Sequence, residues 1–307
     1  MNRHLLDIES LSDDDIGRLL ARTAELRSGE APSPRRGAAG LLFAEPSTRT
    51  RVSFELAARR LGLDPVRIDE AGSSAVKGES LVDTARTLAA MGLRALVVRH
   101  RDEDAPRMLA RALDAEFGAD GPGVVNAGDG TRSHPSQALL DAAVLQAEGL
   151  DWASARIVIV GDIRHSRVAR SDATLFHRLG AREIRLAGPA GWMPDDAELA
   201  FAERCDTLDA ALDGADVVVC LRVQRERHDG SSVADDDIAA WRLDADRAAG
   251  LATHACILHP GPVNRGVEIS SAVADEPRSR ILEQVRTGVA LRTAVFEWLI
   301  PGDETPC

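Results

Sequence analysis

Short aliphatic runs alternate along the chain with segments of helical pattern, and this alternation restricts the fold more than any other feature of the sequence. The clearest runs lie at residues 95–98, 157–160, 217–221 and 256–258, and weaker candidates lie at 66–69, 124–127 and 184–187. Runs of this length without polar residues are typical of strands that are buried on both faces of a parallel sheet.

The segments between these runs carry helix signals with defined ends. Apolar spacing over 54–61 fits one helical face, and Gly62 follows it as a stop signal. A capping box begins at Ser80, helix 135–148 begins with a proline, and a last long helix is predicted over 279–299. Strands that alternate with helices predict an α/β protein made of doubly wound parallel sheets.

The length of 307 residues suggests about two domains. We expect a first domain over 1–133, a connecting helix over 134–149 and a second domain over 150–278. The C-terminal helix, 279–300, is expected to pack back on the first domain. Residues 28–40 are rich in Gly, Pro and Ser and are predicted to form a loop.

Charge and composition exclude several functional classes. The 37 basic and 49 acidic residues give a net charge of −12, and aromatic residues make up 3% of the chain. Both values argue against nucleic-acid binding. No apolar run reaches the ~18 residues of a membrane span, and the N-terminus lacks the pattern of a secretory signal. The four cysteines form no C-x-x-C pair, so we expect a cytoplasmic protein without a structural zinc site.

The segment 43–55, F-A-E-P-S-T-R-T-R-V-S-F-E, predicts a phosphate site at the start of a helix. Ser47 is suited to the N-cap, and Thr48, Arg49 and Thr50 would fill the first turn. Backbone N–H groups, hydroxyls and a guanidinium would then converge on one point. The alternative is an ordinary capped helix with solvated arginines. The Gly-rich Walker loop is absent.

Cationic and hydrogen-bonding residues follow the ends of several predicted strands. These residues are Arg99, His134 with Gln137, Arg167, Arg222 with Gln224, and the H-P-G-P segment with Gly261 and Pro262. Ligands of open parallel sheets bind beyond the carboxyl ends of the strands. Each residue alone could be a solvated loop residue or a cap, but together they indicate a small substrate with several negative charges. Neither a dinucleotide fingerprint nor a metal-ligand spacing is present, so no cofactor and no metal are predicted.

Lys77 is the only lysine in the chain, and the other 36 basic residues are arginines. An arginine bias this strong suggests that Lys77 occupies a place where a compact, flexible ammonium is needed. Chance retention in an exposed loop is the alternative.

Seven motifs together resemble the aspartate/ornithine transcarbamylase family. They are S-T-R-T-R at 47–51, S-S-A-V-K-G-E-S-L-V-D-T at 73–84, N-A-G-D-G at 126–130, H-P-S-Q at 134–137, G-D-I-R-H-S-R-V-A-R-S at 161–171, L-R-V-Q-R-E-R at 221–227 and H-P-G-P-V-N-R-G-V-E-I at 259–269. The likeness is greater to the aspartate branch than to the ornithine branch. The ornithine branch typically has H-C-L-P in place of H-P-G-P, and usually a lysine where Glu45 stands.

The resemblance implies two domains with the active site in the cleft between them. The first would bind carbamoyl phosphate and the second L-aspartate, and the products would be N-carbamoyl-L-aspartate and phosphate, a committed step of pyrimidine synthesis. Ser47, Thr48, Arg49 and Thr50 would hold the phosphate, and Thr50, Arg99 and His134 would polarise the carbamoyl oxygen. The carbamoyl nitrogen would be bound by Gln137 and by the backbone near Gly261 and Pro262.

The resemblance also implies that Arg167, Arg222 and Gln224 bind aspartate. Ser73 and Lys77 would reach the site of an adjacent subunit in a homotrimer, where Lys77 would meet phosphate and aspartate. A regulatory chain or a dihydroorotase partner stays open. Thr293 and Phe296 depart from the commoner residues of the last helix, which we interpret as a matter of packing.

Two other functions remain to be weighed against this interpretation. The chain could carbamoylate another small amino acid in a secondary pathway. Alternatively, it could be a silent paralogue that binds a partner enzyme. The complete set of site residues argues against the second alternative.

Overall fold

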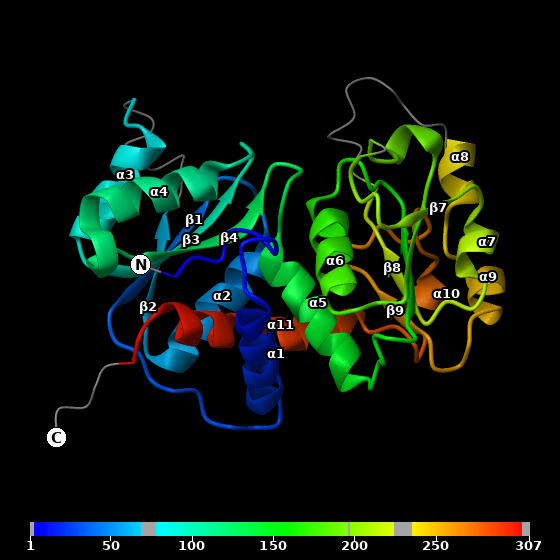
Figure 1. Cartoon of the computed structure of the whole chain (residues 1–307), viewed down its shortest axis with the longest axis horizontal. Coiled ribbons are helices and arrows are strands. Elements are labelled where there is room, and N and C mark those ends of the chain that lie inside the picture. Colours follow the sequence, from blue (N-terminus) through cyan, green and yellow to red (C-terminus); the bar gives the residue numbers. More distant parts are fainter. Residues whose placement is uncertain (1–2, 69–77, 196, 224–234, 303–307) are drawn as a thin grey trace. The chain divides into compact units, whose positions relative to one another are not determined.

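The computed structural model describes residues 3–68, 78–195, 197–223 and 235–302 (Figure 1). The helices are α1 (Asp13–Arg27), α2 (Thr48–Leu61), α3 (Leu81–Ala90), α4 (Ala105–Phe117), α5 (Pro135–Ala147), α6 (Arg167–Arg178), α7 (Leu208–Leu212), α8 (Asp235–Ala240), α9 (Ala245–Ala249), α10 (Ser271–Ala274) and α11 (Ile281–Leu299). The strands are β1 (Ala38–Phe43), β2 (Asp64–Ile68), β3 (Leu93–His100), β4 (Gly123–Asp129), β5 (Arg156–Val160), β6 (Glu183–Ala187), β7 (Glu203–Cys205), β8 (Val217–Cys220) and β9 (Cys256–Leu258). Within these residues, no helix is both long and apolar enough to cross a bilayer.

The chain forms two compact units, and the first comprises the residues up to Ala143 and those from Arg286 onward. Its parallel sheet has the strand order β2-β1-β3-β4. Helices α3 and α4 cover one face of this sheet, and α2 and α11 lie on the other (Figure 1). Phe54 of α2 and Phe296 of α11 meet edge to face with ring centroids 5.7 Å apart, so the unusual Phe296 is a packing residue.

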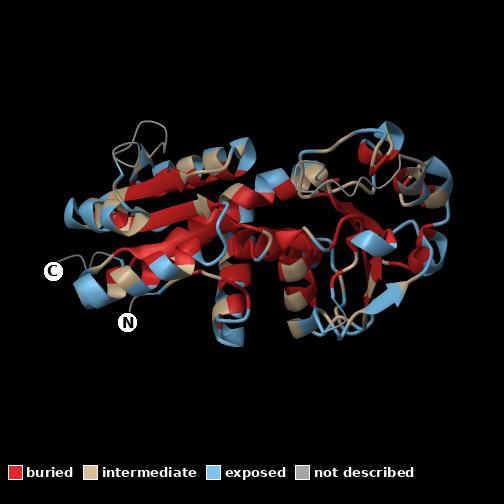
Figure 2. Ribbon diagram, turned by 90° about the horizontal axis from the view of Figure 1, so that it is seen from above, coloured by how far each residue is buried: buried red, intermediate tan, exposed pale blue. Residues whose placement is uncertain are grey.

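The second unit spans Val144–Val285 and is built on a parallel sheet of strand order β7-β6-β5-β8-β9. Helices α7, α9 and α10 contribute to one buried cluster with alternate residues of β5 and β8. Helix α6 packs on the other face through Phe176, whose ring lies 5.6 Å from that of Trp152. Buried residues follow the strands and the helix faces turned toward them in both units (Figure 2). The predicted doubly wound α/β architecture is therefore confirmed.

Local signals fixed most element ends as expected. Gly62 ends α2 in the left-handed region at φ 83°, and the Ser80 hydroxyl accepts the Asp83 N–H to begin α3. The predicted loop 28–40 is wrong at its end, because β1 begins at Ala38. Small residues precede Leu41 and Leu42 in this segment, so its sequence gives only a weak strand signal. It forms a strand because β2 and β3 pair with it on either side.

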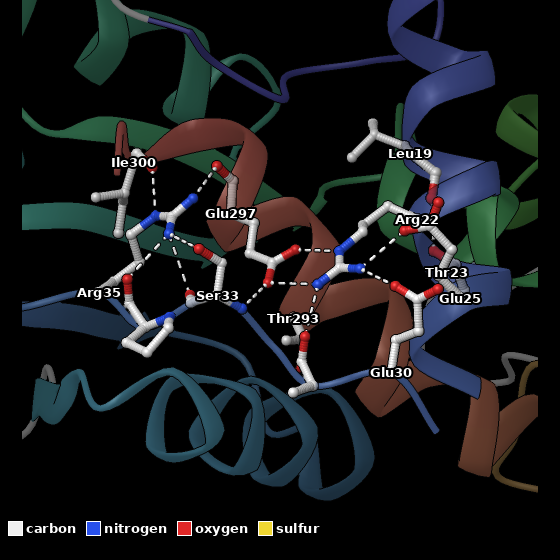
Figure 3. Close-up of polar contacts among 12 residues, drawn as sticks. Leu19, Arg22, Thr23, Glu25, Glu30, Ser33, Arg35, Thr293, Glu297 and Ile300 are labelled. Atoms are coloured by element: carbon white, nitrogen blue, oxygen red, sulfur yellow. Dashed lines mark hydrogen bonds and ion pairs between the residues drawn. The ribbon is translucent and has the colours of Figure 1, made fainter. Parts of the chain in front are cut away.

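A polar network attaches the segment before β1 to α11 (Figure 3). The Glu297 carboxylate accepts from Arg22 Nε at 2.6 Å and from the Ser33 N–H at 2.6 Å. Arg35 is buried and donates to the carbonyl oxygens of Ile300 at 2.7 Å and Glu297 at 3.2 Å. The hydrogen bonds that Arg22 donates to Glu297 and Glu25 raise the pKa of Arg22 above its usual range. The network therefore joins α11 to α1 and to the loop that follows α1, from both of which α11 is remote in sequence.

We predict that Glu297→Ala lowers the free energy of unfolding by about 2–3 kcal/mol. The change removes the shared acceptor of Arg22 Nε and the Ser33 N–H, while Arg22 keeps its contacts with Glu25, Glu30 and the Ala31 carbonyl oxygen. Loss of two hydrogen bonds to one mostly buried carboxylate exceeds the value of an exposed ion pair. Urea unfolding followed by circular dichroism measures the effect. Asp14→Ala is the matched control, since its ion pair with Arg18 is exposed and should contribute below about 0.5 kcal/mol. Equal urea midpoints for the two variants would contradict the prediction.

Candidate active site

The N-terminus of α2 has the predicted arrangement for binding phosphate, with one difference at Ser47. Ser47 occupies the N-cap with extended backbone angles, but its side chain makes no capping hydrogen bond. The first intrahelical bond runs from the Arg51 N–H to the Ser47 carbonyl oxygen, at 3.1 Å. Thr48 and Arg49 are exposed, whereas Thr50 is buried. The first turn of α2 thus has the backbone arrangement that binds anions at helix N-termini.

Arg99 brings together the carboxyl ends of three strands. It lies near the end of β3, and its Nη1 donates to the Ala127 carbonyl oxygen of β4 at 3.1 Å. Its Nε lies 3.5 Å from Glu45 Oε2, just beyond β1, and the Ala44 N–H donates to the Arg99 carbonyl oxygen. The predicted cation therefore stands beside the turn that leads into α2.

The loop between β4 and α5 carries His134, and sequence analysis did not identify the residue that shapes it. The Asp129 carboxylate accepts the Ser133 N–H at 2.9 Å, and the Asp129 N–H donates to the Ser133 carbonyl oxygen at 3.2 Å. Burial raises the pKa of Asp129 above its usual range. His134 is buried directly before α5, and its carbonyl oxygen accepts the Gln137 N–H at 2.9 Å. The only hint of this role was the position of Asp129 between two glycines in N-A-G-D-G.

Gln137 is oriented by a buried carboxylate. Its Nε2 donates to both oxygens of Asp141, each at 3.1 Å, and Asp141 is fully buried. An anion requires the donor end of the amide, so Oε1 of Gln137 must point away from Asp141. Oε1 can therefore accept an N–H from a ligand.

Arg292 of α11 is a buried cation that interacts electrostatically with Asp141, and the sequence analysis did not predict it. It donates to the Gly288 carbonyl oxygen at 3.0 Å and lies over the Phe54 ring, 5.1 Å from the centroid. Burial lowers the pKa of Arg292 to about 10, while the charge of Asp141 acts in the opposite direction. An arginine inside the apolar run V-A-L-R-T-A-V-F was the available signal.

In the second unit, Arg167 follows β5 as predicted and is the first residue of α6. It is buried, with 6% of its surface exposed. The buried Asp162 shapes the preceding loop, since its Oδ1 accepts the His165 N–H at 3.3 Å and lies 2.8 Å from His165 Nδ1. The Ser166 hydroxyl accepts the Ala169 N–H and caps the helix. The loop thus holds a cation at the carboxyl end of the sheet.

The remaining predicted residues of this unit follow β8 and β9. Arg222 is half-buried and comes two residues after the end of β8. Gly261 and Pro262 follow β9, and Gly261 has φ 67°. Gln224, like Ser73 and Lys77, lies outside the described residues. In each unit, the predicted residues that the structure describes therefore lie near the carboxyl ends of that unit's own strands.

Two of the cysteines lie in the core of the second unit. Cys220 and Cys256 are buried in β8 and β9, and burial raises the pKa of both thiols. This agrees with their interpretation as inert core residues. Within the described residues, no three His, Cys, Asp or Glu side chains form a group that could hold a metal ion.

Comparison with known sequences identifies two family domains and close relatives. Residues 3–147 match the carbamoyl-P binding domain, and residues 153–299 the Asp/Orn binding domain, of aspartate/ornithine carbamoyltransferases. An aspartate carbamoyltransferase catalytic subunit of Stenotrophomonas maltophilia is 46% identical, over 97% of this chain and 96% of the relative. A protein of the same name from Xanthomonas euvesicatoria is 45% identical over the same shares.

Solved structures of similar fold come from both branches. Aspartate transcarbamoylase of Trypanosoma cruzi, in complex with N-(phosphonacetyl)-L-aspartic acid, has a TM-score of 0.84 at 30% identity and covers 97% of this chain and 96% of its own. Ornithine carbamoyltransferase of Pyrococcus furiosus has a TM-score of 0.86 at 24% identity, with 99% and 98% covered. The second likeness concerns the fold alone.

Proposed function

Because the chain belongs to the aspartate/ornithine carbamoyltransferase family, we propose that it transfers the carbamoyl group of carbamoyl phosphate to the amine of L-aspartate. The products are N-carbamoyl-L-aspartate and phosphate, and the reaction serves pyrimidine synthesis. The observation that carries the proposal is the position of Arg99, which joins three strand ends beside the turn that leads into α2. The names of the close relatives favour aspartate over ornithine as the acceptor.

The residues of the first unit bind and polarise carbamoyl phosphate. Its phosphate lies on the first turn of α2, against Ser47, Thr48, Arg49 and Thr50. Arg99, His134 and the Thr50 hydroxyl donate toward the carbamoyl oxygen, where negative charge develops as the amine attacks. Preorganised donors of this kind typically contribute about 3–4 kcal/mol each to the transition state.

The carbamoyl nitrogen carries N–H groups and therefore needs acceptors. Gln137 supplies Oε1, because its amide nitrogen is engaged by Asp141. The backbone at Gly261 and Pro262 supplies further contacts. These donors and acceptors together fix the plane of the carbamoyl group before attack. Such positioning lowers the entropic part of the barrier to the transfer.

The acceptor amino acid is bound by Arg167, Arg222 and Gln224. Two guanidinium groups suit two carboxylates, because each can donate a pair of parallel hydrogen bonds. The aspartate amine then attacks the carbamoyl carbon, and the bond from that carbon to the phosphate oxygen breaks. The amine proton leaves with the phosphate, so neither a protein nucleophile nor a cofactor takes part.

The enzyme works as a homotrimer in the cytoplasm, with Ser73 and Lys77 completing the site of the adjacent subunit. Exposed apolar side chains support an association of subunits, since Val52 and Leu56 lie one turn apart on α2 and Val66 lies on the edge strand β2. The word subunit in the relatives' names favours a further partner chain, for which a regulatory chain and a dihydroorotase are the candidates.

The deciding experiment is a carbamoylation assay with purified protein. Carbamoyl phosphate is offered with L-aspartate, L-ornithine or diaminopropionate, and phosphate release is measured. We expect turnover with L-aspartate as the acceptor and none with L-ornithine or diaminopropionate. Preference for another amine would favour the secondary-pathway alternative, and no turnover with any of the three would favour the silent paralogue.

We predict that Arg222→Ala raises the KM for aspartate about 10- to 100-fold and changes the KM for carbamoyl phosphate less than about threefold. Loss of a charge-assisted clamp on one carboxylate accounts for the first value. Steady-state kinetics with each substrate varied in turn measures both. Arg222→Lys, which keeps the charge but not the fork, should fall between the variant and the wild type. Equal rises in both KM values would contradict the assignment of Arg222 to the aspartate pocket.

A further inference from the structure

A buried hydrogen-bond network surrounds His259, the residue directly after β9. Its imidazole is fully buried, and the side chain of Glu268 beside it is 4% exposed. His259 Nε2 lies 3.1 Å from Glu268 Oε1, and the Gly261 N–H lies 2.8 Å from His259 Nδ1. The Asn264 N–H donates to the same Glu268 oxygen at 2.5 Å. One imidazole and one carboxylate thus hold the turn 259–264 at two points.

The chemistry of these partners defines the tautomer of His259. A backbone N–H can only donate, so Nδ1 must be the unprotonated nitrogen that accepts it. The proton then sits on Nε2 and is donated to Glu268 Oε1. In a doubly protonated ring, the Nδ1–H would face the Gly261 N–H, and neither of these groups could accept a hydrogen bond.

The backbone of the turn depends on this contact. Gly261 has φ 67°, a conformation that only glycine adopts readily, so the local chain has no strong preference of its own for this geometry. The base of the turn is fixed by another bond, from the His259 N–H to the Oε1 of the buried Gln284 at 2.9 Å. The imidazole therefore holds the backbone at Gly261, whereas Gln284 holds the chain at the end of β9.

We propose that His259 is a positioning residue for the carbamoyl subsite: its neutral Nδ1 holds the Gly261 N–H and so sets the backbone atoms at Gly261 and Pro262 that contact the carbamoyl group. The proposal rests on the function proposed above. His259 does not touch the substrate. Its effect is on the carbamoyl end of carbamoyl phosphate, because the phosphate end is bound by α2.

Two substitutions separate the two bonds of the imidazole. In His259→Asn, the amide oxygen stands at the position of Nδ1, so the acceptor for Gly261 is kept and the donor to Glu268 is lost. In His259→Gln, the amide nitrogen reaches the position of Nε2, so the donor is kept and the acceptor is lost. Each variant loses one buried hydrogen bond, and a merely structural role predicts equal effects.

The expected result is unequal effects on carbamoyl phosphate. His259→Gln should raise its KM about tenfold, the value of one lost hydrogen bond, and His259→Asn should stay within about threefold of the wild type. Inhibition by inorganic phosphate alone should be unchanged in both variants, because that anion needs only the α2 site. Equal KM values in the two variants, or parallel weakening toward carbamoyl phosphate and inorganic phosphate, would overturn the proposal.

The tautomer can be tested on the wild-type protein, which covers the case in which a variant fails to fold. Nitrogen-15 NMR distinguishes a protonated from an unprotonated ring nitrogen, and whichever of His259→Asn and His259→Gln folds identifies the signal by its loss. A protonated Nδ1 would overturn the proposal. An inactive wild-type enzyme would reject the proposed function, whereas an active enzyme with equal variants would reject only the role of His259.

Discussion

Arg49→Ala is expected to lower kcat/KM for carbamoyl phosphate by about 10²–10³-fold while the protein stays folded. The guanidinium stands in the first turn of α2, where the helix N-terminus and the Ser47 hydroxyl already favour an anion. Its charge-assisted hydrogen bonds act on a leaving group that gains charge in the transition state, and losing one such donor typically has an effect of this size. Arg49 is exposed, so its removal should change stability by no more than about 0.5 kcal/mol.

Kinetics at low and at saturating carbamoyl phosphate, together with thermal unfolding, measure both parts of this prediction. Arg60→Ala is the matched control, since Arg60 is an exposed arginine in the last turn of the same helix. It removes the same charge from α2 and should leave kcat/KM within about twofold of the wild type. Normal turnover of Arg49→Ala at both substrate levels would refute the assignment of Arg49.

Acylation of Lys77 by an amine-specific reagent is expected to abolish activity. Lys77 is the only lysine, so the chain offers such a reagent one ε-amine besides its α-amino group. Acylation removes the charge that is proposed to meet the phosphate and the aspartate carboxylate. Carbamoyl phosphate with succinate, a dicarboxylate that lacks the attacking amine, should protect the enzyme. Mass spectrometry of the modified peptide and residual activity are measured together.

The variant Lys77→Arg is the control for the α-amino group, because it offers no ε-amine. The reagent should leave the residual activity of this variant unchanged, and loss of that activity would assign the inactivation to the N-terminus instead. Activity that survives complete acylation of Lys77 in the wild type would refute its role.

Hybrid trimers test whether Lys77 acts across a subunit boundary. Lys77→Ala and Arg49→Ala should each be nearly inactive alone. After dissociation and reassembly of a mixture, some interfaces pair an intact Arg49 with an intact Lys77 of the neighbour, and activity should return. Verified hybrids without activity would show that both residues serve the same subunit's site.

The sequence by itself determined the features that depend on neighbouring residues. Aliphatic runs located strands such as β5 and β8, because a strand buried on both faces needs apolar residues at every position. Ser80 and Gly62 marked helix ends, because capping and left-handed geometry are properties of one or two residues. The rule for parallel sheets predicted Arg99 and His134 near strand ends of the first unit and Arg167 beyond β5 of the second.

Only the tertiary structure decided which atoms these residues present. Strand β7, E-R-C, has no apolar run, and it forms because β6 offers it a parallel partner. The direction of the Gln137 amide is set by Asp141, and the buried charge of Arg292 reaches that group from α11. The tautomer of His259 is set by Gly261 and Glu268. Hydrogen-bond direction and protonation depend on partners brought together by folding, and spacing along the chain does not contain that information.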